Sequence, residues 1–133
     1  MNREILFRGK HNGEWLEGYY IKATHHWHEH GKHEDWIVVD IIQNGGWCNV
    51  RGKYAVIPET VGQYTGLTDK NGKKIFEGDI VEYKEEYGVI EYHEQEAMFV
   101  VEFVGWLTDF DHMYGNEVEI IGNIHDNPDL IGE

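Results

Sequence analysis

Five histidines lie within nine residues of the sequence and are the first side chains that could do chemistry. They are His25, His26, His28, His30 and His33, with Glu29, Glu34 and Asp35 among or beside them. On an extended strand, His26, His28 and His30 would share one face, because alternate side chains of a strand point the same way. Imidazole nitrogens at that spacing can chelate zinc or nickel. The cluster supports a hypothesis of a metal-dependent enzyme or metal sensor, against the simpler interpretation of a solvated hairpin tip.

A second polar cluster, Asp109-Phe110-Asp111-His112, brings two carboxylates and an imidazole into four residues. Such a group could bind a cation or transfer protons. The spacing lacks the later glutamate of an EF-hand loop, and we interpret the cluster as a polar loop with one buried phenylalanine.

Nucleophilic catalysis has little support in this sequence. The chain contains no serine, which excludes a Ser-His-Asp triad, and its single cysteine, Cys48, is expected to be a structural thiol. We predict no catalytic residue and no cofactor-binding residue, so an enzyme is the less favoured class.

Negative charge is concentrated in the second half of the chain. The net charge is −14, and after Lys84 there is no Lys or Arg, whereas thirteen carboxylates follow. Binding to nucleic acid depends on cations that neutralise phosphates, so direct binding is not expected. The same charge favours a basic host or phage protein as partner.

Five glutamates gather around one expected hairpin: Glu85, Glu86, Glu91, Glu94 and Glu96. Alternate residues of a strand are spaced about as widely as successive phosphates, so a DNA-mimicking inhibitor of a host nucleic-acid-binding protein is an alternative hypothesis. The simpler interpretation is a solvated outer face of a sheet. Trp27 and Trp106 lie in polar or loop contexts, and with Glu91 they are the predicted partner-binding residues.

Short β-rich segments separated by glycine turns must position these residues. Strands are expected near Ile5–Gly9, Trp15–Ile21, Trp36–Ile42, Trp47–Val50, Tyr54–Ile57, Ile80–Tyr83, Val89–His93, Met98–Phe103 and Val118–Ile121. Gly18 is expected to mark a bulge or a close backbone approach, and Gly105–Asn116 a long loop. Asn127-Pro128 predicts one short terminal helical turn. This pattern indicates an all-β sandwich or small barrel.

The stretch Val61–Tyr83 contains the strongest turn chemistry. Asn-Gly supplies positive φ at both central positions of a type I′ hairpin, which predicts one at Asn71-Gly72 and another hairpin at Asn12-Gly13. Asp79 follows Gly78 and is expected to accept backbone N–H groups in a turn.

Several segments together resemble the YopX family of phage and prophage proteins. They are ILFRGK (Ile5–Lys10), EWLEGYY (Glu14–Tyr20), VIPETVGQYTGLTDKNGKKIFEGDIVEY (Val56–Tyr83) and VEIIGNIHDNPDL (Val118–Leu130). The resemblance implies a β-rich, phage-encoded protein with an N-terminal sheet region and a small SH3-like C-terminal barrel. It also implies a homo-oligomer. It supplies no activity and no catalytic residues.

These observations predict an all-β protein with a β-rich region at residues 1–60, which is the candidate oligomerising part, and a small SH3-like barrel at residues 61–133. No stretch has the ~20 apolar residues of a membrane helix, and no signal peptide is recognised, so we expect a protein of the bacterial cytoplasm without membrane contact. The favoured function is non-enzymatic binding of a protein partner.

Overall fold

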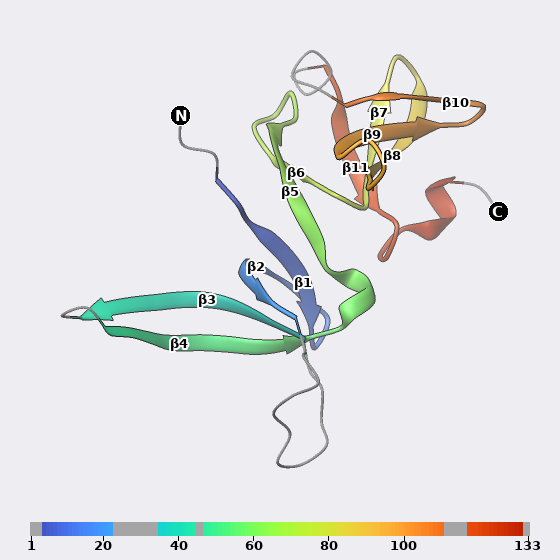
Figure 1. Ribbon diagram of the computed structural model, residues 1–133. Coiled ribbons are helices and arrows are strands. Elements are labelled where there is room, and N and C mark those ends of the chain that lie inside the picture. The colour runs from blue at the N-terminus through green and yellow to red at the C-terminus, as the bar shows by residue number, and fades with distance from the viewer. Residues whose placement is uncertain (1–3, 23–34, 45–46, 111–116, 132–133) are drawn as a thin grey trace. The chain divides into compact units, whose positions relative to one another are not determined.

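The computed structural model describes residues 4–22, 35–44, 47–110 and 117–131, with the backbone alone at 40–44, 47–51 and 53. The chain divides into two compact units, each with its own set of contacts. We call Glu4–Gln63 the N-terminal unit and Tyr64–Glu133 the C-terminal unit. Both are built mainly of antiparallel strands (Figure 1), so the expected β class is confirmed.

The strands form two antiparallel sheets, with pairing orders β4-β3-β2-β1-β5-β6 and β10-β9-β8-β7-β11. The elements are β1 (Phe7–His11), β2 (Glu14–Ile21), β3 (Asp35–Asn44), β4 (Trp47–Val56), η1 (Pro58–Thr60), β5 (Gly62–Thr68), β6 (Lys74–Phe76), β7 (Asp79–Tyr83), β8 (Glu86–His93), β9 (Met98–Phe103), β10 (Trp106–Asp109), β11 (Glu119–Asn123) and η2 (Pro128–Ile131). Within the described residues no pairing joins β10 to β11, so the SH3-like barrel stays a prediction.

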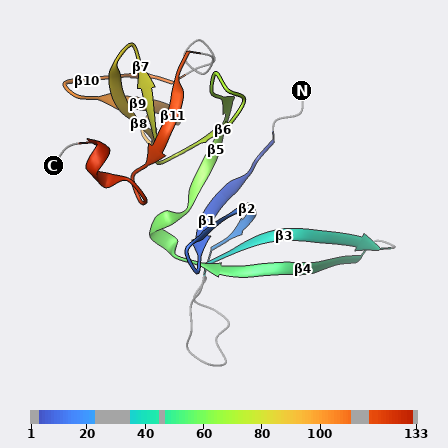
Figure 2. The same cartoon turned by 180° about the vertical axis from the view of Figure 1, so that it is seen from behind.

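The N-terminal unit contains a hairpin, β1–β2, and a long ribbon, β3–β4. Asn12 and Gly13 have φ of 51° and 83°, which confirms the Asn-Gly hairpin expected there. Figures 1 and 2 show β3 and β4 extending together away from β1 and β2. Strand β2 pairs with β3 from Tyr19↔Val38 to Ile21↔Trp36, and in the described part of the chain β3 and β4 pair only with each other beyond that point. The two weak segments expected at Trp47–Val50 and Tyr54–Ile57 are one continuous strand.

Gly18 lies where β2 approaches the backbone of β3. A Cβ at this position would stand 2.2 Å from the carbonyl oxygen of Val38, which is far inside van der Waals contact. The close backbone approach expected at Gly18 is therefore confirmed.

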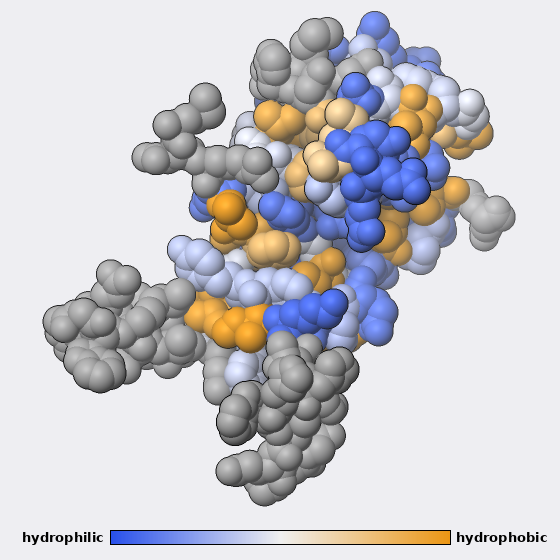
Figure 3. Space-filling view, viewed as in Figure 1, coloured by the Kyte–Doolittle hydropathy of each residue, from blue (hydrophilic) through white to orange (hydrophobic). Residues whose placement is uncertain are grey.

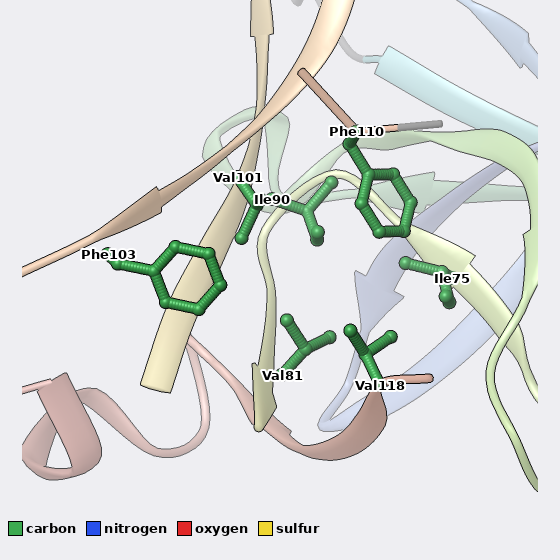
Figure 4. Packing of buried hydrophobic residues seen from close by; sticks show 7 residues of the cluster. All are labelled: Ile75, Val81, Ile90, Val101, Phe103, Phe110 and Val118. Carbon is green, nitrogen blue, oxygen red and sulfur yellow. The ribbon is translucent and has the colours of Figure 1, made fainter. Parts of the chain in front are cut away.

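The C-terminal unit has a core of aliphatic and aromatic side chains. Figure 4 shows its buried members converging from β6, β7, β8, β9 and the chain on either side of residues 111–116: Ile75, Val81, Ile90, Val101, Phe103, Phe110 and Val118. Phe110 is buried, as expected for the one apolar residue of its polar cluster. The expectation of a loop from Gly105 was wrong, because Trp106–Asp109 forms strand β10 against β9.

Two buried aspartates hold the turns of the C-terminal unit. Asp79 Oδ2 accepts the backbone N–H of Phe76 at 2.8 Å, which confirms the turn role expected for it. Asp69 Oδ1 accepts the N–H groups of Asn71 and Lys73 at 2.8 and 2.9 Å. The type I′ turn expected at Asn71-Gly72 was wrong, because only Gly72 has positive φ. The Asp69 carboxylate organises a longer turn in its place.

A candidate binding groove in the C-terminal unit

A groove of about 520 Å³ lies in the C-terminal unit beside the β8–β9 hairpin and η2. Its lining comes from the β7–β8 turn, both strands of the hairpin, the residue after β9 and η2: Glu85, Glu86, Tyr87, Val89, Glu102, Phe103, Val104, Leu130 and Ile131. The paired register sets Val89 directly opposite Glu102 on one face of the hairpin. Segments almost fifty residues apart in sequence therefore form one concave surface.

The groove combines an apolar lining with negative charge. Val104 is 89% exposed, and Tyr87 and Ile131 are each 41% exposed. Three glutamates, Glu85, Glu86 and Glu102, are also exposed. Figure 3 shows hydrophobic patches directly beside hydrophilic ones over this unit. Such a surface suits a ligand that carries both an apolar part and a positive charge.

Trp106 fixes one of these carboxylates. Its indole stacks on Phe103, with ring centroids 4.4 Å apart and planes 14° apart. Its Nε1 donates a hydrogen bond to Glu86 Oε1 at 3.1 Å. Because Phe103 is anchored in the core, the indole gives the Glu86 carboxylate a rigid support. Trp106, which the sequence proposes as a partner contact, therefore lies next to the groove and holds one of its charged groups.

The turn that carries Glu85 has an unusual backbone. Lys84 and Glu85 have φ of 49° and 70°, and they join β7 to β8 in a two-residue hairpin turn. Asn-Gly normally occupies such positions, and other residues cost about 1 kcal/mol each. Strand β8 begins at Glu86, three residues before the start expected at Val89. Backbone strain of this kind is characteristic of functional sites.

Glu91 lies on β8 near the groove residue Glu102. Burial raises the pKa of Glu91, and the charge and hydrogen bond of Glu102 and the charge of Glu77 raise it further, while His93 lowers it. Its Oε2 is buried and accepts no hydrogen bond within the described residues. Glu91 therefore favours its protonated form more than an exposed glutamate does, and a nearby cation would oppose that preference.

The five glutamates that suggested DNA mimicry do not form one row. Glu85 precedes β8, whereas Glu94 and Glu96 follow it at the other end. Glu86 and Glu91 are an odd number of positions apart on the strand, so their side chains start toward opposite faces.

The predicted metal residues His26, His28 and His30, and the predicted contact Trp27, lie outside the described residues. The same holds for Asp111 and His112, while Asp109 is an exposed residue of β10. Across residues 4–22, 35–44, 47–110 and 117–131, no three His, Cys, Asp or Glu side chains gather as a metal site would require. In that same part of the chain, no helix is long and apolar enough to cross a membrane.

Most of the groove was not found from sequence. Tyr87, Val104, Leu130 and Ile131 are single apolar residues without a motif, and the sequence placed them in turns or at strand ends. The available signal was the combination of apolar residues with the surrounding glutamates. Trp106 and Glu91 were predicted as partner contacts on other grounds, and they lie next to the groove and near its residue Glu102.

Three comparisons with known proteins bear on identity. A family model described as YopX protein matches residues 6–132. The crystal structure of protein EF1440 from Enterococcus faecalis is similar, with 26% sequence identity and a TM-score of 0.66 over 98% of this chain and 99% of that one. No curated protein matches.

Proposed function

The chain belongs to the YopX family, and we propose that its C-terminal unit is a non-enzymatic module that binds a basic protein. The observation that carries this proposal is the groove, in which Glu85, Glu86 and Glu102 accompany exposed apolar side chains. A phage-encoded protein acting in the bacterial cytoplasm would meet basic partners of the host or of the phage there.

The charge of the whole unit supports a basic partner. Residues 61–133 carry four Lys or Arg against seventeen Asp or Glu. A field of this sign accelerates association with a positive protein and disfavours nucleic acid and anionic lipid. The apolar lining then supplies the contact area that long-range attraction alone lacks.

The test compares capture of basic host proteins by untagged full-length protein and its groove variants, with quantification by mass spectrometry. Val104→Asn removes an exposed apolar contact without changing charge, and Leu107→Asn is a matched control on β10 outside the groove lining. We expect Val104→Asn to reduce capture of the same partner several-fold and Leu107→Asn to leave it unchanged. Equal capture by both variants and the parent protein would overturn the proposal.

Self-association is a second proposed property, and the β3–β4 ribbon supports it. Among the residues that the structure describes, the two strands pair only with each other beyond Val38 and Gly52, so over that length each has an outer edge without a paired strand. An isolated two-stranded ribbon is marginally stable in water, and pairing with a second copy would stabilise it.

Deletion of residues 41–50, with a short glycine linker in their place, tests this property. Sedimentation velocity over a range of concentrations should show an oligomer for the full chain and a smaller species for the shortened one. If the full chain and the shortened chain contained the same number of subunits per particle, the ribbon would not be the contact between copies.

A further inference from the structure

We propose that the groove binds an arginine side chain, carried on an extended segment of the partner together with one aliphatic residue. This inference rests on the proposed function and specifies the chemistry of the ligand. It is argued from the size of the groove, its lining and the placement of its carboxylates.

The size of the groove limits its occupant. A volume of about 520 Å³ lies within the ~300–1,000 Å³ range of sites that hold small ligands. An α-helix with its side chains is ~10–12 Å across and would need a longer groove. A few side chains of an extended segment fit this space better.

The lining favours arginine among cationic side chains. Tyr87 offers an aromatic ring that is 41% exposed, and the guanidinium group stacks on aromatic faces more readily than the ammonium group. The guanidinium is also more weakly hydrated, so it loses less on entering a groove that is partly apolar. Its several N–H donors can form two hydrogen bonds with one carboxylate, and within the groove lining Glu102 shares a face of the hairpin with Val89 and Tyr87.

The carboxylates are suited to a cation that arrives from outside. One oxygen of Glu86 accepts the Trp106 indole N–H, which holds the group in place and leaves its second oxygen as a further acceptor. Glu102 lies beside Glu91, and the two negative charges repel one another. A bound guanidinium would relieve that repulsion, so the site is preorganised for positive charge.

The aliphatic position follows from the apolar part of the lining. Leu130 and Ile131 of η2 and Val104 after β9 contribute aliphatic side chains to the groove. An aliphatic residue next to the arginine would cover these side chains and exclude water from the charged contact.

The experiment titrates the full-length protein with nine-residue peptides of glycine and serine that carry one arginine next to one leucine. Binding is followed by nuclear magnetic resonance through the methyl groups of Val104, Leu130 and Ile131. Peptides with citrulline or lysine in place of arginine are the matched ligands. We expect binding to weaken about fivefold or more with citrulline, and less with lysine, because the charged hydrogen bonds are lost or reduced.

Protein variants distinguish the site from general attraction to an acidic protein. Glu102→Gln should weaken binding of the arginine peptide several-fold, whereas Glu94→Gln, beyond the other end of β8, should not. The inference fails if the citrulline peptide binds as well as the arginine peptide. It also fails if the arginine peptide causes no chemical-shift change at the methyl groups of Val104, Leu130 and Ile131. If either happens while Val104→Asn still lowers capture of the protein partner, the groove functions but its ligand is not arginine.

Discussion

The carboxylate of Asp69 accepts a hydrogen bond from the backbone N–H of Ile120 at 3.0 Å, across fifty-one positions of the chain. The same carboxylate serves two N–H groups of its own turn, so it joins the β5–β6 turn to β11. Asp69→Ala leaves three donors without this acceptor. We expect it to lower the free energy of unfolding by about 2–4 kcal/mol, as measured by urea denaturation.

Asp109→Ala, at an exposed position of β10, is the matched control and should change stability little. The effect of Asp69 also depends on pH. Burial alone would raise the pKa of Asp69, but the N–H groups of Ile120, Lys73 and Asn71 and the Lys73 charge outweigh it and hold the pKa below its usual value. Its contribution is therefore present above the unfolded pKa of about 3.9 and is lost as pH falls through the lower folded pKa. Equal acid sensitivity of Asp69→Ala and the parent protein would contradict this role.

Asp69 also marks the limit of what the sequence could predict about turns. Asn-Gly pairs are local signals, and at Asn12-Gly13 local chemistry decided the outcome. At Asn71-Gly72 a carboxylate two residues upstream, fixed by a distant strand, selected another backbone conformation. Tertiary hydrogen bonds of this kind cannot be read from any window of sequence, whereas the apolar run that predicts β9 lies within a single window.

The Lys84-Glu85 turn should be easy to stabilise. Replacing it by Asn-Gly relieves two positive-φ residues and should raise the free energy of unfolding by about 1–2 kcal/mol. Thermal and urea denaturation measure the gain. The same change removes the groove carboxylate of Glu85, so binding of a basic partner should weaken while stability increases. Such a result would show that the Lys84-Glu85 turn lowers stability but contributes to binding through Glu85.

The control for this turn is Glu94→Gly, at a residue without positive φ. Glycine there only adds freedom to the unfolded chain, so stability should fall slightly or stay constant. A loss of stability in the Asn-Gly variant would show that the Lys84 contact with the Tyr83 ring, at 5.2 Å, outweighs the strain.

Tyr20 and Asp35 form a polar pair in the N-terminal unit. Burial, the hydrogen bond to Asp35 and the charge of Asp35 together raise the pKa of Tyr20 to about 12. Tyr20 stabilises the fold below its unfolded pKa of about 10, and this contribution is lost as pH rises toward 12. Asp35→Asn should lower the pKa of Tyr20, as measured by nuclear magnetic resonance of ring-labelled tyrosine.

The effect of Tyr20→Phe on the free energy of unfolding tests the same pair. Tyr19→Phe is the control, because the neighbouring Tyr19 is 58% exposed. We expect a loss of about 1–2 kcal/mol at Tyr20 and almost none at Tyr19. A pKa of Tyr20 that does not respond to Asp35→Asn would show that burial alone accounts for it.

The groove was harder to predict than the strands for a physical reason. A strand can be predicted from the residue types of a short segment. The groove instead depends on a contact between η2 and β8, which are separated by about forty residues of sequence. Leu130 and Ile131 have no distinguishing chemistry until that contact exists. Trp106 was proposed as a contact with another molecule because it is a large aromatic residue in a polar segment, and in the structure its ring also contacts Phe103 and Glu86.

Binding of the arginine peptide should depend on pH through Glu91. Its carboxyl is raised in pKa by burial, by Glu102 on β9 and by Glu77, with His93 acting in the opposite direction. A guanidinium beside Glu102 favours the ionised form of Glu91, so binding releases a proton, and affinity should fall as pH drops through the raised pKa. Glu91→Gln should flatten this dependence, whereas Glu94→Gln should preserve it. Peptide affinity measured from pH 4 to pH 8 checks the effect, and identical slopes in the parent protein and Glu91→Gln would exclude Glu91 as the coupled group.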